Sequence, residues 1–219
     1  MTRTPLDDLI RAVETATLSD DLVGAIATLI ADSEFKAEDQ VLNCLVQILG
    51  FNNPGAAGLA MQGLIRLGPP AVTPLLSVVE SANYGARAWA VCALASIGDP
   101  RSLPILEDAL ATDIAPSVRR AAARGLGSLR LEALEPSQRE QVVERALLAL
   151  ERGGDDAEWV VRYAVAVGLE SLARDMPRDS APRKRSRSRL EVLSELRSEA
   201  VPVVRLRAQL ALKRLEAGS

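Results

Sequence analysis

Apolar residues return at helical spacing along most of the chain. In residues 84–97 they fall on one face, at positions that include Trp89, Cys92, Ala93 and Ile97. Gly98 is suited to the left-handed end of that helix, and Asp99 followed by Pro100 is a typical start of the next. Residues 84–112 therefore predict a helical hairpin.

The same pattern predicts helices throughout and no sheet, because no segment alternates with period two for long enough. The expected helices are 5–16, 19–32, 37–50, 54–67, 71–81, 84–97, 101–111, 116–130, 137–151, 158–173, 189–198 and 202–216.

The hairpins repeat. An arginine followed three positions later by a small or β-branched residue and seven positions later by leucine occurs at Arg87, Arg119, Arg162 and Arg205. An earlier copy keeps the frame without the arginine and ends at Gly68, and the spacings between copies are 30, 32, 43 and 43 residues. Such periods are typical of stacked helical hairpins. The fold class predicted is all-α: a right-handed α-solenoid of HEAT-like helical-hairpin repeats.

The repeats predict a single domain over residues 1–219. Within it we expect N-terminal helices in 5–50, core repeats in 54–173, a mobile basic loop in 175–189 and C-terminal helices in 189–216. The loop is expected because Asp175–Arg189 contains Pro177, Pro182 and six basic residues with no large aliphatic side chain besides Met176.

Composition excludes several functions. The sequence has no histidine, so a Ser-His-Asp triad or an imidazole-bound zinc is impossible, and two cysteines cannot make a four-cysteine site. We expect no metal, and Cys44 and Cys92 as buried thiols. A net charge of −3 argues against nucleic acid. No apolar stretch is long enough to insert in a membrane, and Met1–Pro5 lacks a signal-peptide core, so a cytoplasmic location is expected.

The candidate binding residues combine cations with scarce aromatics. Tyr84, Arg87 and Trp89 stand within six residues, and Trp159, Arg162 and Tyr163 repeat the combination. Rings beside a guanidinium suit a flat anionic ligand. The alternative is structural: Trp89 is core, and the repeated arginines form a ladder to carboxylates such as Asp99 or Asp113. Glu140, Glu144, Glu151 and Asp155 are interpreted as a solvated helix face.

Two phrases carry a family resemblance. Residues 83–91, Asn-Tyr-Gly-Ala-Arg-Ala-Trp-Ala-Val, and residues 115–127, Ala-Pro-Ser-Val-Arg-Arg-Ala-Ala-Ala-Arg-Gly-Leu-Gly, resemble the F-type (β) subunits of the E/F-type phycobilin lyases of cyanobacteria. The resemblance implies a lyase subunit, active with an E-type partner in a heterodimer. It also implies an open-chain tetrapyrrole (bilin), phycocyanobilin above all, as substrate with no other cofactor, and a phycobiliprotein α subunit of the phycobilisome as acceptor. Some F-type relatives isomerise the bilin with a motif that includes histidine, which this chain lacks.

Joining a thiol to the bilin's ethylidene double bond forms a C–S bond and needs no metal, so the enzyme must chiefly orient the reactants. The residues predicted to bind bilin are Tyr84, Arg87, Trp89, Asp99, Arg119, Trp159, Arg162 and Tyr163. Asp99 would accept pyrrole N–H groups, or else only cap its helix. Two alternatives remain open: a scaffold or chaperone for phycobiliproteins or other proteins, and a HEAT adaptor in an unrelated pathway.

Overall fold

A computed structural model describes residues 5–32 and 35–217, and every regular element in these ranges is a helix. The chain divides into two compact units, Met1–Ile97 and Gly98–Ser219. The expectation of one domain over 1–219 stays a prediction. The expectation that the N-terminus lacks a signal peptide was based on Met1–Pro5, and Met1–Thr4 lie outside the described residues. Within those ranges, no helix has the length and apolar content needed to span a bilayer.

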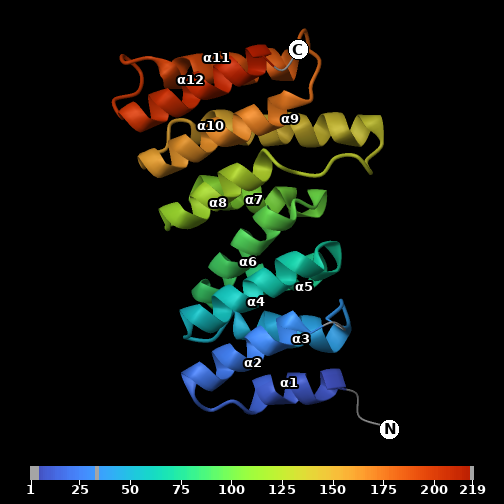
Figure 1. Ribbon diagram of the computed structural model, residues 1–219. Coiled ribbons are helices and arrows are strands. Elements are labelled where there is room, and N and C mark those ends of the chain that lie inside the picture. Colours follow the sequence, from blue (N-terminus) through green and yellow to red (C-terminus); the bar gives the residue numbers. More distant parts are fainter. Residues whose placement is uncertain (1–4, 33–34, 218–219) are drawn as a thin grey trace. The chain divides into compact units, whose positions relative to one another are not determined.

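The first unit consists of helix pairs (Figure 1). Its elements are α1 (Pro5–Thr15), α2 (Ser19–Ala31), α3 (Asp39–Ile48), α4 (Pro54–Leu67), the 3₁₀ turn η1 (Pro69–Ala71), α5 (Val72–Val79) and α6 (Tyr84–Ile97). The predicted bounds of α4 and α6 are confirmed.

Helices α4 and α6 each begin with an asparagine N-cap, and the two caps are 30 residues apart. The side-chain oxygen of Asn53 accepts a hydrogen bond from the backbone N–H of Ala56 at 3.1 Å, and that of Asn83 accepts one from Ala86 at 3.1 Å. Each bond satisfies one of the N–H groups that a helix start leaves open. Asn83 also donates to the Gly50 carbonyl at 3.0 Å, which ties the start of α6 to the preceding repeat.

The second unit continues the pairs. Its elements are the 3₁₀ turn η2 (Pro100–Ser102), α7 (Leu103–Thr112), α8 (Pro116–Leu126), α9 (Pro136–Gly153), α10 (Trp159–Arg174), α11 (Ala181–Ser194) and α12 (Pro202–Ala217). Helix α10 packs between α8 and α12, while α9 contacts α7 and α11 (Figure 1).

Glycine permits the closest approaches in this unit. A Cβ atom on Gly127 would lie 2.3 Å from the Gly168 carbonyl oxygen, and one on Gly168 would lie 2.5 Å from the Ala123 carbonyl oxygen. Helices α8 and α10 therefore touch backbone to backbone. Gly98 has φ +72°, as its predicted role at the end of a helix requires.

The predicted mobile loop in 175–189 is wrong for most of its length. Residues 181–194 form α11, so the helix expected at 189–198 starts eight residues earlier and ends at Ser194. Pro182 does not prevent this, because it lies in the first turn, where its missing N–H costs nothing.

Two kinds of partner order the basic residues of α11. Arg183 is buried and donates to the carbonyls of Met176 at 2.6 Å and Leu215 at 2.7 Å. Arg185 pairs with both Glu144 and Glu151 of α9. Glu144 and Glu151 are therefore not simply solvated, and neither is Asp155, whose carboxylate pairs with Arg189 at 2.6 Å.

Candidate functional site

The start of α6 presents a ring and a cation together. Tyr84 is 36% exposed, and the guanidinium carbon of the half-buried Arg87 lies 5.5 Å from the centre of its ring. This distance is within the range of a cation–π contact. Arg87 has no carboxylate partner among residues 5–32 and 35–217. The prediction that Tyr84 and Arg87 share a helix face is confirmed.

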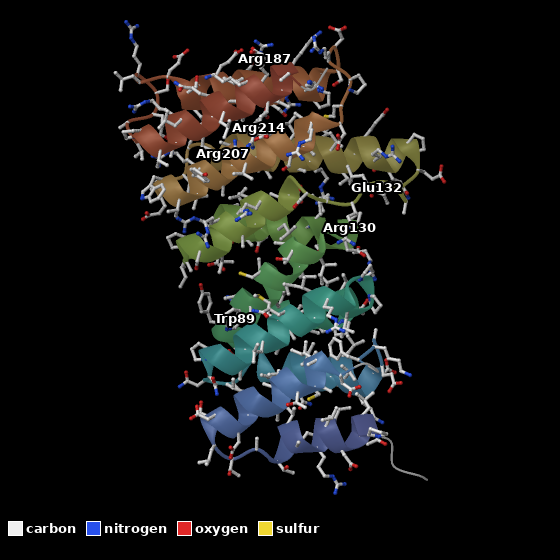
Figure 2. The ribbon with its side chains drawn as sticks, viewed as in Figure 1. Trp89, Arg130, Glu132, Arg187, Arg207 and Arg214 are labelled. Atoms are coloured by element: carbon white, nitrogen blue, oxygen red, sulfur yellow. The ribbon has the colours of Figure 1, made fainter. Side chains whose placement is uncertain are left out.

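Trp89 is half-buried, so the interpretation of this residue as core is only partly right. Helix α4 presents Gly58 to it: a Cβ atom on Gly58 would lie 3.9 Å from Trp89 Cη2. The indole of Trp89 (labelled in Figure 2) therefore packs against α4 at Gly58 and remains partly exposed to solvent.

Asp99 has the capping role. Its Oδ1 accepts hydrogen bonds from the backbone N–H and the Nε of Arg101, both at 2.9 Å, and its Oδ2 accepts one from Arg101 Nη2 at 2.8 Å. The Arg101 hydrogen bonds lower the pKa of the Asp99 carboxyl despite its partial burial. Both oxygens are thus engaged within their own turn.

Arg119 and Arg162 form the structural ladder, with other carboxylates than expected. Arg119 donates from Nε and Nη2 to Asp156 at 2.7 and 3.0 Å, and Arg162 donates likewise to Glu199 at 2.6 and 2.8 Å. The prediction that the carboxylates of Asp99 and Asp113 pair with these arginines is wrong. Asp113 contributes its backbone carbonyl, which accepts from Arg119 Nη1 at 2.8 Å.

Each carboxylate of the ladder also accepts a backbone hydrogen bond within its own loop. Asp156 accepts from the N–H of Glu158 at 2.8 Å, and Glu199 accepts from Val201 at 2.9 Å. Burial raises the pKa of Asp156, but the hydrogen bonds from Arg119 and Glu158 more than offset it and the pKa is lowered. The hydrogen bond from Arg162 lowers the pKa of Glu199. Both groups are therefore charged at neutral pH.

Trp159 and Tyr163 lie one turn apart on α10. Trp159 is 44% exposed and Tyr163 is half-buried. Arg162, the cation expected beside them, directs its guanidinium to Glu199 and to the carbonyls of Asp156 and Ala157. The Tyr84–Arg87 arrangement is not reproduced with Arg162.

Cys44 is buried as predicted, whereas Cys92 is only half-buried. Burial, reinforced by Glu14, raises the pKa of the Cys44 thiol to about 11. The thiolate is the nucleophilic form of cysteine. Cys44 is therefore not a reactive nucleophile at neutral pH.

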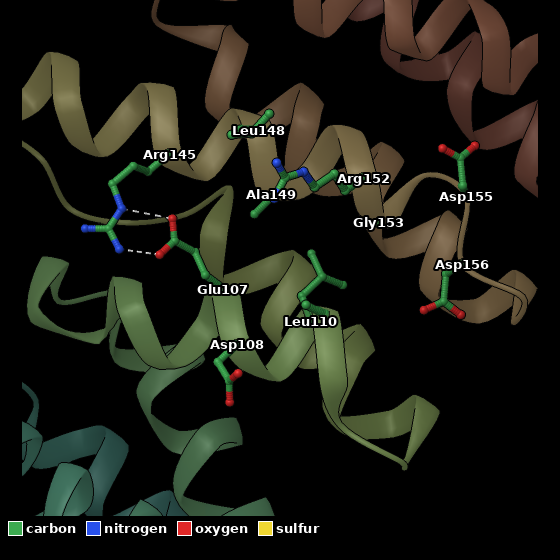
Figure 3. Close-up of a pocket in the computed structure, with 11 residues that line it drawn as sticks. Glu107, Asp108, Leu110, Arg145, Leu148, Ala149, Arg152, Gly153, Asp155 and Asp156 are labelled. Atoms are coloured by element: carbon green, nitrogen blue, oxygen red, sulfur yellow. Dashed lines mark hydrogen bonds and ion pairs between the residues drawn. The ribbon is translucent and has the colours of Figure 1, made fainter.

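A cavity of about 570 Å³ lies beside α7 and α9 (Figure 3). Glu107 and Leu110 contribute to it from α7, and Arg145, Leu148 and Arg152 from α9. None of these residues was a sequence candidate. The available signal was the spacing of 145, 148 and 152, which places two cations and a leucine on one face of α9.

Comparison with known proteins identifies the family. The sequence is 48% identical over 212 residues, 96% of each chain, to the bilin biosynthesis protein RpcF of Synechococcus sp. strain WH8020. It is 47% identical over 180 residues, 82% of each chain, to the phycocyanin alpha phycocyanobilin lyase CpcF of Synechocystis sp. PCC 6803. The chain belongs to the phycobilin lyase family, among its F-type (β) subunits.

Two further comparisons agree. Residues 42–127 match the HEAT repeats family. The solved complex of CpcE and CpcF of phycocyanin lyase from Nostoc sp. PCC7120 contains a chain with 43% identity and a TM-score of 0.71, which covers 80% of this chain and 99% of that one. The predicted all-α, HEAT-like fold and the F-type resemblance are both confirmed.

Proposed function

We propose that this chain is one subunit of a heterodimeric lyase. With an E-type partner it binds an open-chain tetrapyrrole, phycocyanobilin, and promotes its attachment to a cysteine of a phycobiliprotein α subunit. The observation that carries this proposal is the 47% identity to a phycocyanin alpha phycocyanobilin lyase over 82% of both chains. The solved CpcE–CpcF complex supports the two-subunit form.

The reaction is an addition. The acceptor sulfur bonds to the ethylidene carbon of the bilin, the thiol proton ends on the tetrapyrrole, and no electron acceptor is required. Binding and orientation are what the chain must contribute. The bilin is a substrate, and the proposal includes no separate cofactor. It places the reaction in the cytoplasm, where acceptor thiols stay reduced.

Tyr84 and Arg87 are the proposed bilin contacts in the first unit. Arg87 has no carboxylate partner in the described part of the chain, so its charge is available to a propionate while Tyr84 offers a ring for stacking. Arg119, Arg162 and Asp99 have their polar groups engaged elsewhere. We assign Arg119 and Arg162 the role of holding successive repeats together, and Asp99 the role of capping its own turn.

The test is coexpression with an E-type subunit, a source of phycocyanobilin and a phycocyanin α subunit. Bilin that stays on the acceptor through denaturing electrophoresis is the expected result, and its loss when the acceptor cysteine is replaced by alanine is the control. The scaffold alternative predicts that the acceptor is bound but carries no covalent bilin. That outcome would overturn the lyase proposal.

A further inference from the structure

The ion pairs at the cavity beside α7 and α9 account for most of its charge. At one end Glu107 pairs with Arg145, both through Nε at 3.1 Å and through Nη2 (Figure 3). At the other end Asp155 pairs with Arg189 at 2.6 Å, and Asp156 with Arg119 at 2.7 Å. These three carboxylates are neutralised by the protein itself.

Two charged side chains that line the cavity, Arg152 and Asp108, take no part in these ion pairs. Arg152 and Asp108 are both exposed, and neither has an ion pair within residues 5–32 and 35–217. Arg152 stands one turn beyond Leu148 on α9, and Asp108 projects from α7. The cavity therefore offers one guanidinium as a donor to an acid and one carboxylate as an acceptor of N–H groups.

Apolar surface lies between the paired ends. Leu148 is 39% exposed, although it is a large aliphatic side chain, and Leu110 and Ala149 also line the cavity. Exposed aliphatic surface in a hollow with a few polar groups is typical of ligand sites. The volume is within the roughly 300–1,000 Å³ of sites for organic ligands.

We propose that this cavity binds an open-chain tetrapyrrole, with a propionate on Arg152, pyrrole N–H groups toward Asp108 and the ring system against Leu148. The inference rests on the proposed function for the identity of the ligand. It adds a binding site in the second unit, separate from Tyr84 and Arg87 in the first. The ion pairs that bound the apolar surface at both ends favour a compact ligand over an extended peptide.

The test titrates phycocyanobilin into the full chain, together with an E-type partner, and fits the change in visible absorbance to two classes of site, because Tyr84 and Arg87 form a separate proposed contact. Arg152→Gln removes the charge and is expected to raise the apparent Kd at least about tenfold, as for loss of a charge-assisted hydrogen bond. The matched control is Arg124→Gln, an exposed arginine on α8 outside the cavity, which should bind as the wild type does.

A second variant tests occupancy rather than charge. Ala149→Phe fills the cavity from its α9 side and is expected to weaken binding while the helical circular dichroism spectrum stays unchanged. If Arg152→Gln and Ala149→Phe both bind with wild-type affinity, the cavity is not the site, whereas normal covalent transfer would leave the proposed function standing. If the wild type binds bilin, the two variants lose one class of site, and no acceptor is labelled, the cavity assignment stands and the lyase proposal fails.

Discussion

Arg162 of α10 and Glu199 of the α11–α12 loop form a two-bond ion pair, at 2.6 and 2.8 Å, between successive repeats. Only 2% of the Glu199 side chain and 16% of the Arg162 side chain are exposed. Arg119 and Asp156 repeat the arrangement one hairpin earlier, and in both cases the partners are 37 residues apart. Of the two roles that the sequence left open for these arginines, the structural ladder holds for Arg119 and Arg162, and it fixes the register between repeats.

Removing one partner of this pair should destabilise the second unit. Arg162→Ala leaves the buried Glu199 carboxylate without its cation, and we expect the free energy of unfolding to fall by about 3 kcal/mol. Urea denaturation measures the loss. Arg124→Ala, which removes an exposed arginine, should change stability by less than about 0.5 kcal/mol. Equal effects of the two variants would contradict the ladder.

The same pair gives stability a pH dependence on the acid side. The pKa of Glu199 is lowered in the folded chain by the hydrogen bond from Arg162. Its stabilising contribution is therefore complete above the unfolded pKa of about 4.3 and is lost as the pH falls through the lower folded value. Urea midpoints of the wild type and Glu199→Gln should differ by a constant amount above about pH 5 and converge below about pH 4. A difference between the two midpoints that grows as the pH falls would contradict the predicted direction of the pH dependence.

The close approach of α8 and α10 predicts that a single methyl group is costly. Gly168→Ala would place Cβ 2.5 Å from a backbone oxygen and 2.9 Å from Leu150 Cδ2, so the helices must separate. We expect a loss of about 3 kcal/mol, at the upper end for overpacking. Gly24→Ala is the matched control, because nothing lies within 4 Å of a Cβ there. That change should stabilise α2 by about 0.5–1 kcal/mol, and thermal melting of both variants compares the two signs.

Limited trypsin digestion tests the ordered state of α11. Lys36 and Arg130 lie outside helices, whereas Arg183, Arg185 and Arg189 are in α11 and held by carbonyls or carboxylates. Mass spectrometry should find the first cuts after Lys36, Arg130 and Arg197, the last of which lies in an exposed turn beyond α11. Glu151→Ala, which removes one partner of Arg185, should speed cleavage within 181–194. First cuts inside α11 of the wild type would restore the loop interpretation.

Local signals explain why most of the fold could be predicted. Gly98, Asp99 and Pro100 mark helix ends through their own local chemistry, so the end of α6 and the start of the second helix of its hairpin follow from the sequence. The first half of α11, residues 181–188, was missed for the opposite reason. Its order depends on carboxylates such as Glu151, 34 residues earlier, and an arginine-rich segment looks solvated until such partners are known. The acidic face of α9, one hairpin before a basic segment, was the available signal.

The site could be predicted only in part. Helical spacing correctly placed Tyr84 and Arg87 on one face, since residues three apart are neighbours. The sequence did not reveal which arginines are already paired, because the carboxylates of Asp156 and Glu199 reach Arg119 and Arg162 only after the hairpins stack. The cavity at Arg152 and Leu148 was missed because it depends on two helices that are separated in the chain.

The role of Arg87 is decided by comparing three variants for bilin transfer and for thermal stability. Arg87→Ala removes a cation that has no carboxylate partner in the described ranges, so we expect covalent transfer to phycocyanin α to fall at least about tenfold with little change in melting temperature. Arg66→Ala is the matched control, since Arg66 in the same unit makes a comparable contact with Phe35, 5.0 Å from the ring centre. Arg66→Ala should leave bilin transfer intact.

Trp89→Ala should instead cost about 1–3 kcal/mol of stability, less than for a fully buried ring, because Trp89 is half-buried. If Arg87→Ala transfers bilin normally and melts early, Arg87 has a structural role and the Tyr84–Arg87 assignment is wrong.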